Sequence, residues 1–172
     1  SVRANAGMIK KVYVPKYIYP LSSVLFNYII FAISLIVLVV VSIVLKVYPT
    51  VYLLQAIIPL ILLLITAFGV GMILSTMAVF FRDLEYLWSV GLMIIMYASA
   101  IFYKPDRLLK SGFGWILKCN PLYLLIHNFR QAVFGMPMNM KFLAASVVFA
   151  IVSVIVGLVF FYKKQDEFIL HI

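Results

Sequence analysis

Long runs without a charged side chain alternate with short charged breaks along this chain. A transmembrane helix needs about 20 mostly apolar residues, because each residue adds about 1.5 Å toward a hydrocarbon core about 30 Å thick. Four runs approach this length, so we expect four membrane-spanning helices at residues 24–45, 59–80, 86–103 and 142–162. The pattern predicts an all-α, polytopic integral membrane protein with a transmembrane domain over residues 24–162.

The two ends of the chain have a different pattern. Residues 1–23 interleave lysines with tyrosines and contain Pro15 and Pro20. Basic and aromatic residues together are typical of a segment that lies at the membrane surface, and the prolines should divide any helix there into short pieces. Residues 163–172 form a short charged tail.

The stretch 108–141 contains glycines and prolines separated by apolar pieces that are too short to span a bilayer. These pieces predict two short re-entrant or interfacial helices. Asn120 followed by Pro121 is a strong start signal for the second helix, with Asn120 as the cap. Gly135 is the expected stop.

A charged break at residues 81–85 separates the second and third expected spans. An Arg or Asp at the centre of a membrane helix costs roughly 2.5 to 3.5 kcal/mol, so such a cluster is either a buried functional site or a membrane exit. The lengths of the flanking runs favour an exit turn, in which Arg82 and Glu85 could pair on a helix face. A role in coupling or gating is the alternative.

Composition excludes an ordinary soluble domain. Hydrophobic residues make up 66% of the chain and charged residues 11%, against about 45–50% and 25% in typical soluble domains. The net charge of +9 could indicate nucleic-acid binding, but the basic residues lie in the gaps between apolar runs rather than in one stripe. Lipid headgroups and orientation signals explain that distribution, so we expect a bilayer and no nucleic acid as the partner.

The chain carries little that could support catalysis. Its one cysteine, Cys119, leaves no partner for an internal disulfide, and His127 and His171 stand apart from any metal-ligand spacing. No phosphate-binding loop of the GxxxxGK[ST] type is present, and no carboxylate pair lies within an expected span. We therefore expect no metal site, no cofactor and no enzymatic activity in this chain.

Charge does not orient the chain. The lysines and arginines outside the four spans divide equally between the two sides of the membrane, although the first span alone favours a cytoplasmic amino terminus.

An ordered set of motifs over nearly the whole chain resembles the type-2 ATP-binding-cassette (ABC) permeases. More narrowly, the chain resembles the branch that exports O-antigen, capsular polysaccharide or teichoic acid. The most specific motifs are Phe81-Arg82-Asp83 after a long span, and Asn120-Pro121 followed by Arg130. The others, in chain order, are Val14-Pro15, Pro20, Ser22, Asn27, Phe102-Tyr103 and Gly135.

The resemblance implies a multi-pass permease of the bacterial inner membrane with both termini in the cytoplasm. It implies a homodimer of permeases bound to two ATPase subunits, which hydrolyse the ATP, and a lipid-linked glycan as cargo. The family has six spans, so we expect this chain to be a carboxy-terminal fragment that lacks the first two.

The resemblance also implies roles for individual positions. A cytoplasmic interface that docks on the ATPase would include Lys10, Lys11, Pro15, Pro20, Arg82 and Asp83. The external re-entrant helices near the channel exit would contain Asn120, Pro121 and Arg130. Sugar chains stack on aromatic rings, so the candidates for a translocation path are Tyr28, Phe31, Tyr97, Phe102 and Tyr103. Each of these rings could equally be a packing or interfacial aromatic.

Two other functions stay open at this point. One is a type-2 exporter of a drug or lipid, which transport assays with different cargoes would separate from a glycan exporter. The other is a membrane-embedded scaffold or transferase, which the sparse acid–base chemistry disfavours.

Overall fold

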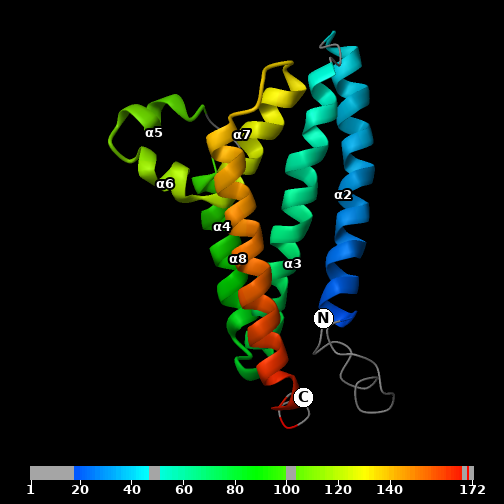
Figure 1. Cartoon of the computed structure of the whole chain (residues 1–172), viewed down its shortest axis with the longest axis vertical. Coiled ribbons are helices and arrows are strands. Elements are labelled where there is room, and N and C mark those ends of the chain that lie inside the picture. The colour runs from blue at the N-terminus through cyan, green and yellow to red at the C-terminus, as the bar shows by residue number, and fades with distance from the viewer. Residues whose placement is uncertain (1–17, 47–50, 100–103, 168–169, 171–172) are drawn as a thin grey trace. The chain divides into compact units, whose positions relative to one another are not determined.

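The computed structural model describes residues 18–46, 51–99, 104–167 and 170, and this part of the chain is built from helices and connecting turns. Figure 1 shows the helices in chain order from blue to red. They are α2 (Ile18–Val44), the 3₁₀ helix η1 (Val51–Ala56), α3 (Ile57–Phe80), α4 (Leu84–Ala98), α5 (Asp106–Lys110), α6 (Gly114–Cys119), α7 (Pro121–Val133), α8 (Met140–Lys164) and the 3₁₀ turn η2 (Gln165–Glu167).

Among the described residues, three helical stretches are long and apolar enough to cross a membrane: Ile18–Val44, Leu54–Phe80 and Met140–Glu167. The remaining expected span, at residues 86–103, is represented by α4, which has 15 residues. At 1.5 Å per residue such a helix is about 22 Å long, less than the hydrocarbon thickness of about 30 Å. Residues 100–103, where we expected this span to end, lie outside the described residues.

The first span begins earlier than expected. Helix α2 starts at Ile18 rather than at residue 24, so the end of the predicted surface segment is part of the span. Pro20, which we expected to interrupt any helix in residues 1–23, lies in the first turn of α2. The amide of a residue in the first turn has no acceptor within the helix, so a proline there loses no hydrogen bond.

The region of short helices also differs in detail from the prediction. We expected two helices between residues 108 and 141, and the structure has three, because a further short helix, α5, begins at Asp106 and extends into this stretch. The start at Pro121 is confirmed, and Gly135 follows the end of α7 with a φ of 73°. This left-handed conformation is strained for residues with a Cβ, which explains why glycine ends the helix here.

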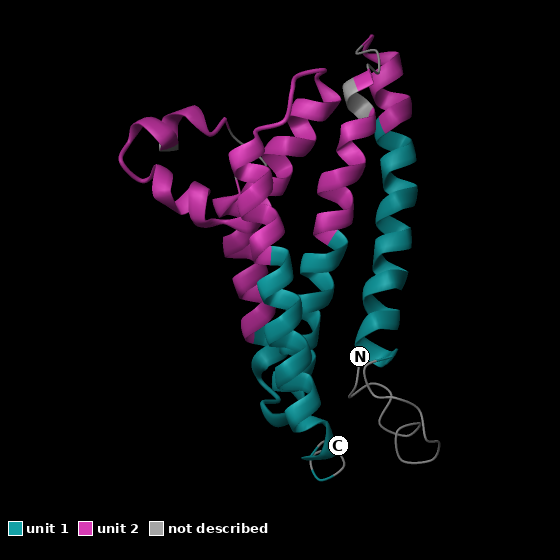
Figure 2. Ribbon diagram, viewed as in Figure 1, with its two compact units in different colours: residues 1–38, 64–86, 150–172 teal, residues 39–63, 87–149 magenta. Residues whose placement is uncertain are grey.

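The chain divides into two compact units, which are coloured separately in Figure 2. The first comprises residues 1–38, 64–86 and 150–172, and the second comprises residues 39–63 and 87–149.

In the first unit, α3 and α8 contact each other through small residues. A Cβ added to Gly69 would lie 2.5 Å from the carbonyl carbon of Ser153, and one added to Gly157 would lie 2.5 Å from the carbonyl oxygen of Gly69. At these distances only glycine fits, so Gly69 and Gly157 let the two helices approach closely. Beside this crossing, a buried apolar cluster combines Tyr19, Met72, Val79 and Phe161.

In the second unit, α7 packs against η1 and α6, and α6 packs against α5. Leu117 of α6 is buried with Tyr123 and Leu124 of α7, and Phe142 at the start of α8 covers this cluster. Helix α7 is thus held on several sides, although it is too short to span a bilayer.

Candidate functional site

The polar groups of the second unit gather at the two ends of α7. At its start, Asn120 makes two hydrogen bonds: its Oδ1 accepts from the backbone N–H of Leu122 at 3.0 Å, and its Nδ2 donates to Ser99 Oγ at 2.9 Å. Ser99 Oγ in turn donates to the carbonyl oxygen of Ile95 at 2.6 Å. The predicted cap at Asn120 is confirmed, and the same side chain also ties the start of α7 to the end of α4.

At the other end of α7, Asn139 connects this helix to α8. Its backbone N–H donates to Asn128 Oδ1 at 3.1 Å and to Gln131 Oε1 at 3.0 Å, and both acceptors belong to α7. Its own Oδ1 accepts from the backbone N–H groups of Lys141 at 3.1 Å and Phe142 at 3.3 Å. Asn139 therefore caps the first turn of α8 while its backbone is held by α7.

An aromatic cluster lies between these two polar ends. The ring of His127 is 5.0 Å from that of Phe142 in an edge-to-face arrangement, and 5.9 Å from that of Tyr123. Burial lowers the pKa of the His127 imidazole below its usual 6.5, and the charge of Arg130 lowers it further. Burial raises the pKa of the Tyr123 phenol. The positive charge of Arg130 acts against this shift, and the negative charge of Asp106 adds to it. Because the pKa of the His127 imidazole is lowered below 6.5, this side chain is neutral at pH 7.

Two side-chain atoms on α7 are buried without a hydrogen-bond partner among the described residues. They are His127 Nδ1 and Asn128 Nδ2. Asn128 is completely buried, and its oxygen is already occupied by Asn139. An unpaired buried amide donor is destabilising, so this part of α7 has hydrogen-bonding capacity that its own fold does not use.

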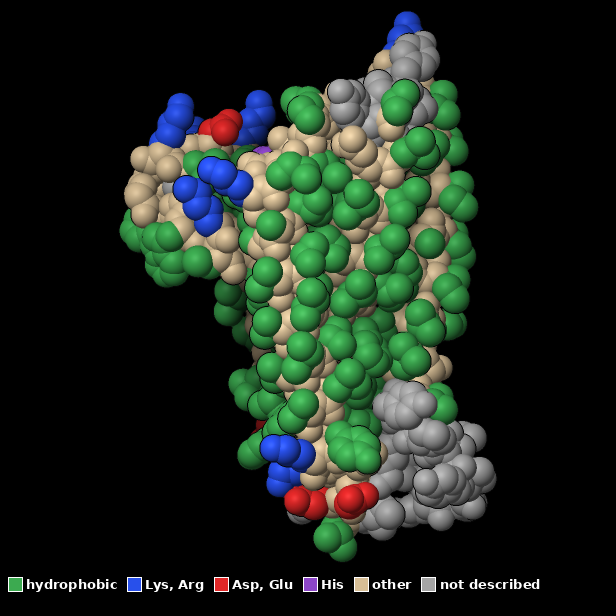
Figure 3. Space-filling model, viewed as in Figure 1, with side chains coloured by type: hydrophobic (Ala, Val, Ile, Leu, Met, Phe, Trp, Pro, Cys, Tyr) green, Lys and Arg blue, Asp and Glu red, His purple; other side chains and the backbone are tan. Residues whose placement is uncertain are grey.

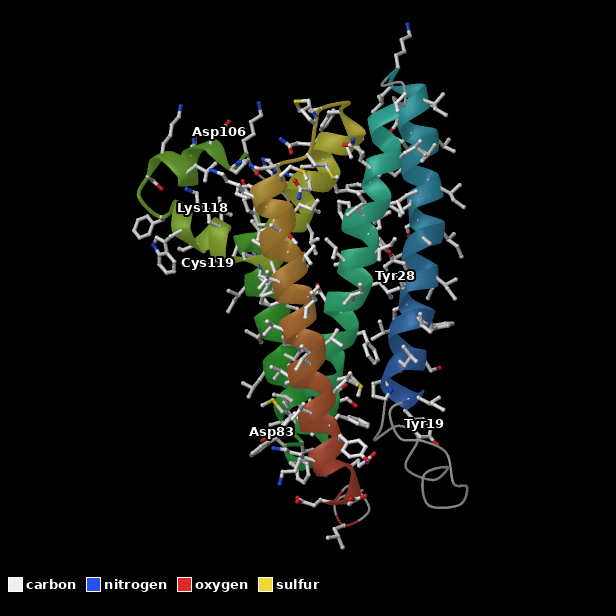
Figure 4. All side chains as sticks on the ribbon, in the orientation of Figure 1. Tyr19, Tyr28, Asp83, Asp106, Lys118 and Cys119 are labelled. Carbon is white, nitrogen blue, oxygen red and sulfur yellow. The ribbon has the colours of Figure 1, made fainter. Side chains whose placement is uncertain are left out.

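The charged break forms a tight turn between α3 and α4. The backbone N–H of Leu84 donates to the carbonyl oxygen of Phe81 at 3.3 Å, and the side chains of Arg82 and Asp83 are exposed. Figure 4 labels Asp83 at this turn. We suggested that Arg82 and Glu85 could pair, but no ion pair joins these two described residues; an ion pair at 3.1 Å links Lys164 to Glu167 instead.

The predicted aromatic path is only partly described. Tyr28 and Phe31 lie on α2 with ring centroids 5.9 Å apart, and Tyr97 on α4 is 58% exposed. Phe102 and Tyr103 lie outside the described residues. Tyr28 and Phe31 contact each other through the one-turn spacing of a helix, which is as expected for packing as for a lining.

The structure describes only some of the residues predicted for the cytoplasmic interface and for the external helices. Of the expected cytoplasmic interface, Lys10, Lys11 and Pro15 lie outside the described residues, and Pro20 is buried in α2. Pro121 is the first residue of α7, and Arg130 lies in its last turn, so Asn120 and Arg130 are at opposite ends of this helix.

The partners of α7 were not predicted from the sequence. We interpreted His127 as isolated and proposed no role for Asn128, Gln131 or Asn139. The spacing of Tyr123 and His127, four residues apart, could have indicated that the two rings share a helix face. No local signal indicated that Phe142 would join them.

Taken together, these features define the protein as a helical integral membrane protein whose described polar groups mainly cap and connect its helices. Among the described residues, no group of three or more His, Cys, Asp or Glu side chains could hold a metal ion. Residues 7–134 match the profile of the ABC-2 type transporter family, and the chain belongs to this family.

The relatives of the chain agree with this assignment. It is similar to an O-antigen export system permease protein RfbA from Klebsiella pneumoniae, with 34% identity over 170 residues, or 98% of this chain. A second RfbA permease protein from Klebsiella pneumoniae is 32% identical over the same share. The chain spans 65% of the length of each of these relatives. No solved structure matches the chain significantly.

Proposed function

We propose that the chain is part of the membrane-spanning permease of an ATP-driven exporter of cell-envelope polysaccharide. One observation carries this proposal: the identity of 34% to an O-antigen export permease extends over 98% of the chain, rather than over one apolar helix. Apolar helices resemble one another by composition alone, so a match that also includes the short polar helices is more specific than one between spans.

The proposal includes a separate ATPase subunit and a second copy of the permease. Family membership supports the ATPase, because an ABC-2 type transporter is the membrane component of an ATP-driven system. The cargo would be a lipid-linked glycan such as O-antigen, capsule or teichoic acid. The location would be the inner membrane of a bacterium, with both termini in the cytoplasm and α4 part of a fourth span.

In this arrangement the turn at Arg82 and Asp83 faces the cytoplasm and, with Lys10, Lys11, Pro15 and Pro20, contacts the ATPase. The exposure of both charged side chains and the lack of an Arg82–Glu85 pair support this, since they are available to a partner. Helix α7, with Asn120, Pro121 and Arg130, would lie on the external side. The rings of Tyr28, Phe31, Tyr97, Phe102 and Tyr103 would contribute to the path of the glycan.

Purification of the tagged full-length protein from its own membranes tests this proposal. We expect an ATPase subunit to purify with it, and the reconstituted complex to move a lipid-linked glycan across a vesicle membrane in the presence of ATP. Movement of a hydrophobic drug or phospholipid, with none of the glycan, would instead assign a different cargo. Purification without an ATPase would overturn the proposal.

A further inference from the structure

Helices α5 and α6 form a small helical hairpin with a close internal contact. Gly112, with a φ of 76°, makes the turn between them. A Cβ added to Gly114 would lie 3.2 Å from the Cα of Leu109, so glycine lets the start of α6 approach the backbone of α5. The contact between these two helices gives the hairpin, residues 104–119, a defined surface.

This surface is amphipathic. Phe113 and Trp115 are 58% and 63% exposed, and Ile116 is exposed beside them. Four exposed cations accompany these apolar side chains, against a single carboxylate at Asp106: Lys104, Arg107, Lys110 and Lys118. Figure 3 shows Lys and Arg side chains together on one side of the hairpin and hydrophobic side chains on the opposite side.

The separation of the two kinds of side chain follows from the helix geometry of α6. Gly114 and Leu117 face inward, and Leu117 is fully buried. Trp115, Ile116 and Cys119 share the exposed apolar arc, and Lys118 lies at its edge. In Figure 4 the labelled Lys118 and Cys119 lie on different sides of α6.

We propose that the hairpin of residues 104–119 is a binding surface for anionic phospholipid. Trp115, Phe113 and Ile116 enter the boundary between headgroups and acyl chains, where amphipathic rings are favoured. The four cations then lie at the depth of the lipid phosphates and attract headgroups that carry a net negative charge. This inference needs neither the ATPase nor the glycan, so it stands independently of the proposed function.

Charge complementarity distinguishes this occupant from a second copy of the chain. The same surface on another copy would bring four cations against four cations, with only Asp106 on each side to compensate. Anionic headgroups oppose these cations without such repulsion. The acyl chains of a zwitterionic lipid could also cover the apolar side chains of the hairpin. Its headgroup has no net charge, however, and would not compensate the excess positive charge.

The test measures which lipid lies beside Trp115 in the full-length protein. Trp88 and any tryptophan outside residues 1–172 are changed to phenylalanine, and the protein is reconstituted in mixed phosphatidylcholine and phosphatidylglycerol. Two bilayers of identical composition are compared, one with bromine on the acyl chains of phosphatidylglycerol and one with bromine on those of phosphatidylcholine. Bromine quenches tryptophan on contact, so the ratio of quenching reports local enrichment of the anionic lipid.

We expect stronger quenching by brominated phosphatidylglycerol than by brominated phosphatidylcholine. The triple variant Arg107→Gln, Lys110→Gln, Lys118→Gln should keep the quenching and lose the preference, because its apolar side is unchanged. The matched control Lys163→Gln removes an exposed cation from α8 and should keep the preference.

Equal quenching by the two brominated lipids in the unsubstituted hairpin would overturn the proposal. Absence of quenching together with oxidative cross-linking through Cys119 would assign the surface to a second copy instead. If the tryptophan variants fail to fold, a pyrene label on the exposed Cys119, with any cysteine outside residues 1–172 changed to serine, gives the same comparison while Trp88 and Trp115 are kept. If the two brominated lipids quenched that label equally, the proposal would be overturned in the same way.

Discussion

Gly69 and Gly157 bring α3 and α8 into direct backbone contact. A Cβ on Gly157 would lie 2.5 Å from the carbonyl oxygen of Gly69, a distance at which one of the two helices must move. Lipid tails are as apolar as leucine, so helices in a membrane associate through close packing rather than through a hydrophobic driving force. This crossing therefore makes a specific contribution to the stability of the first unit.

Replacing Gly157 by alanine should separate the two helices and lower the free energy of unfolding by about 1–3 kcal/mol, as overpacking typically does. Thermal unfolding in detergent measures this change. The matched control is Gly91→Ala on α4, where the added Cβ would meet only Trp88 Cε3 at 4.0 Å. That variant should match or exceed the wild type, and equal stability of both alanine variants would refute the packing assignment.

Asn120 should be sensitive to two different losses. Asn120→Ala removes the cap of α7 and the bond to Ser99, and a lost cap costs about 1 kcal/mol. Asn120→Asp keeps an acceptor for Leu122 N–H but loses the donor to Ser99. We expect thermal stability in the order wild type, aspartate, alanine. An aspartate variant as unstable as the alanine variant would show that the bond to Ser99, and not the cap, dominates.

His127 should make stability depend on pH. Its pKa is lowered in the folded state, chiefly by burial and then by Arg130, whereas the unfolded chain has the usual value of 6.5. Below that pH the unfolded state binds a proton that the folded state does not, so stability should fall as pH decreases through 6.5. Thermal unfolding of the wild type between pH 5 and pH 8 measures this, and His127→Gln should flatten the profile. An unchanged slope in that variant would assign the pH dependence to other groups.

Arg82 should matter for transport and not for folding. It is exposed, and it makes no ion pair with Glu85, so Arg82→Ala should change stability by no more than about 0.5 kcal/mol. If the turn contacts the ATPase, this variant should insert and assemble normally while glycan transport decreases. Lys163→Ala, which removes another exposed cation near the end of α8, is the control. A variant that fails to insert would show that Arg82 acts as a membrane-exit residue only.

The features that the sequence predicted well are those governed by local chemistry. The cap at Asn120, the helix start at Pro121 and the stop at Gly135 depend on a few adjacent residues and their allowed backbone angles. The apolar runs were equally clear, because the bilayer sets the length of a span. The boundaries were less certain, as Ile18 shows, since a proline in a first turn does not end a helix.

Contacts between distant segments could not be predicted in the same way. Helix α3 is apolar on all sides, so nothing in its sequence indicates that Gly69 meets Gly157 rather than another small residue. Ser99 and Asn120 are separated by 21 positions, and their bond depends on how α4 and α7 are placed. His127 appeared isolated because Phe142 belongs to the following helix.

The most direct test of the central claim is the amount of polysaccharide on the surface of a strain from which the gene has been deleted. An export permease predicts loss of surface glycan, accumulation of the lipid-linked glycan inside the cell, and recovery of both when the intact gene is supplied. A deletion strain with normal surface glycan and no internal accumulation would contradict the assignment of this chain to polysaccharide export.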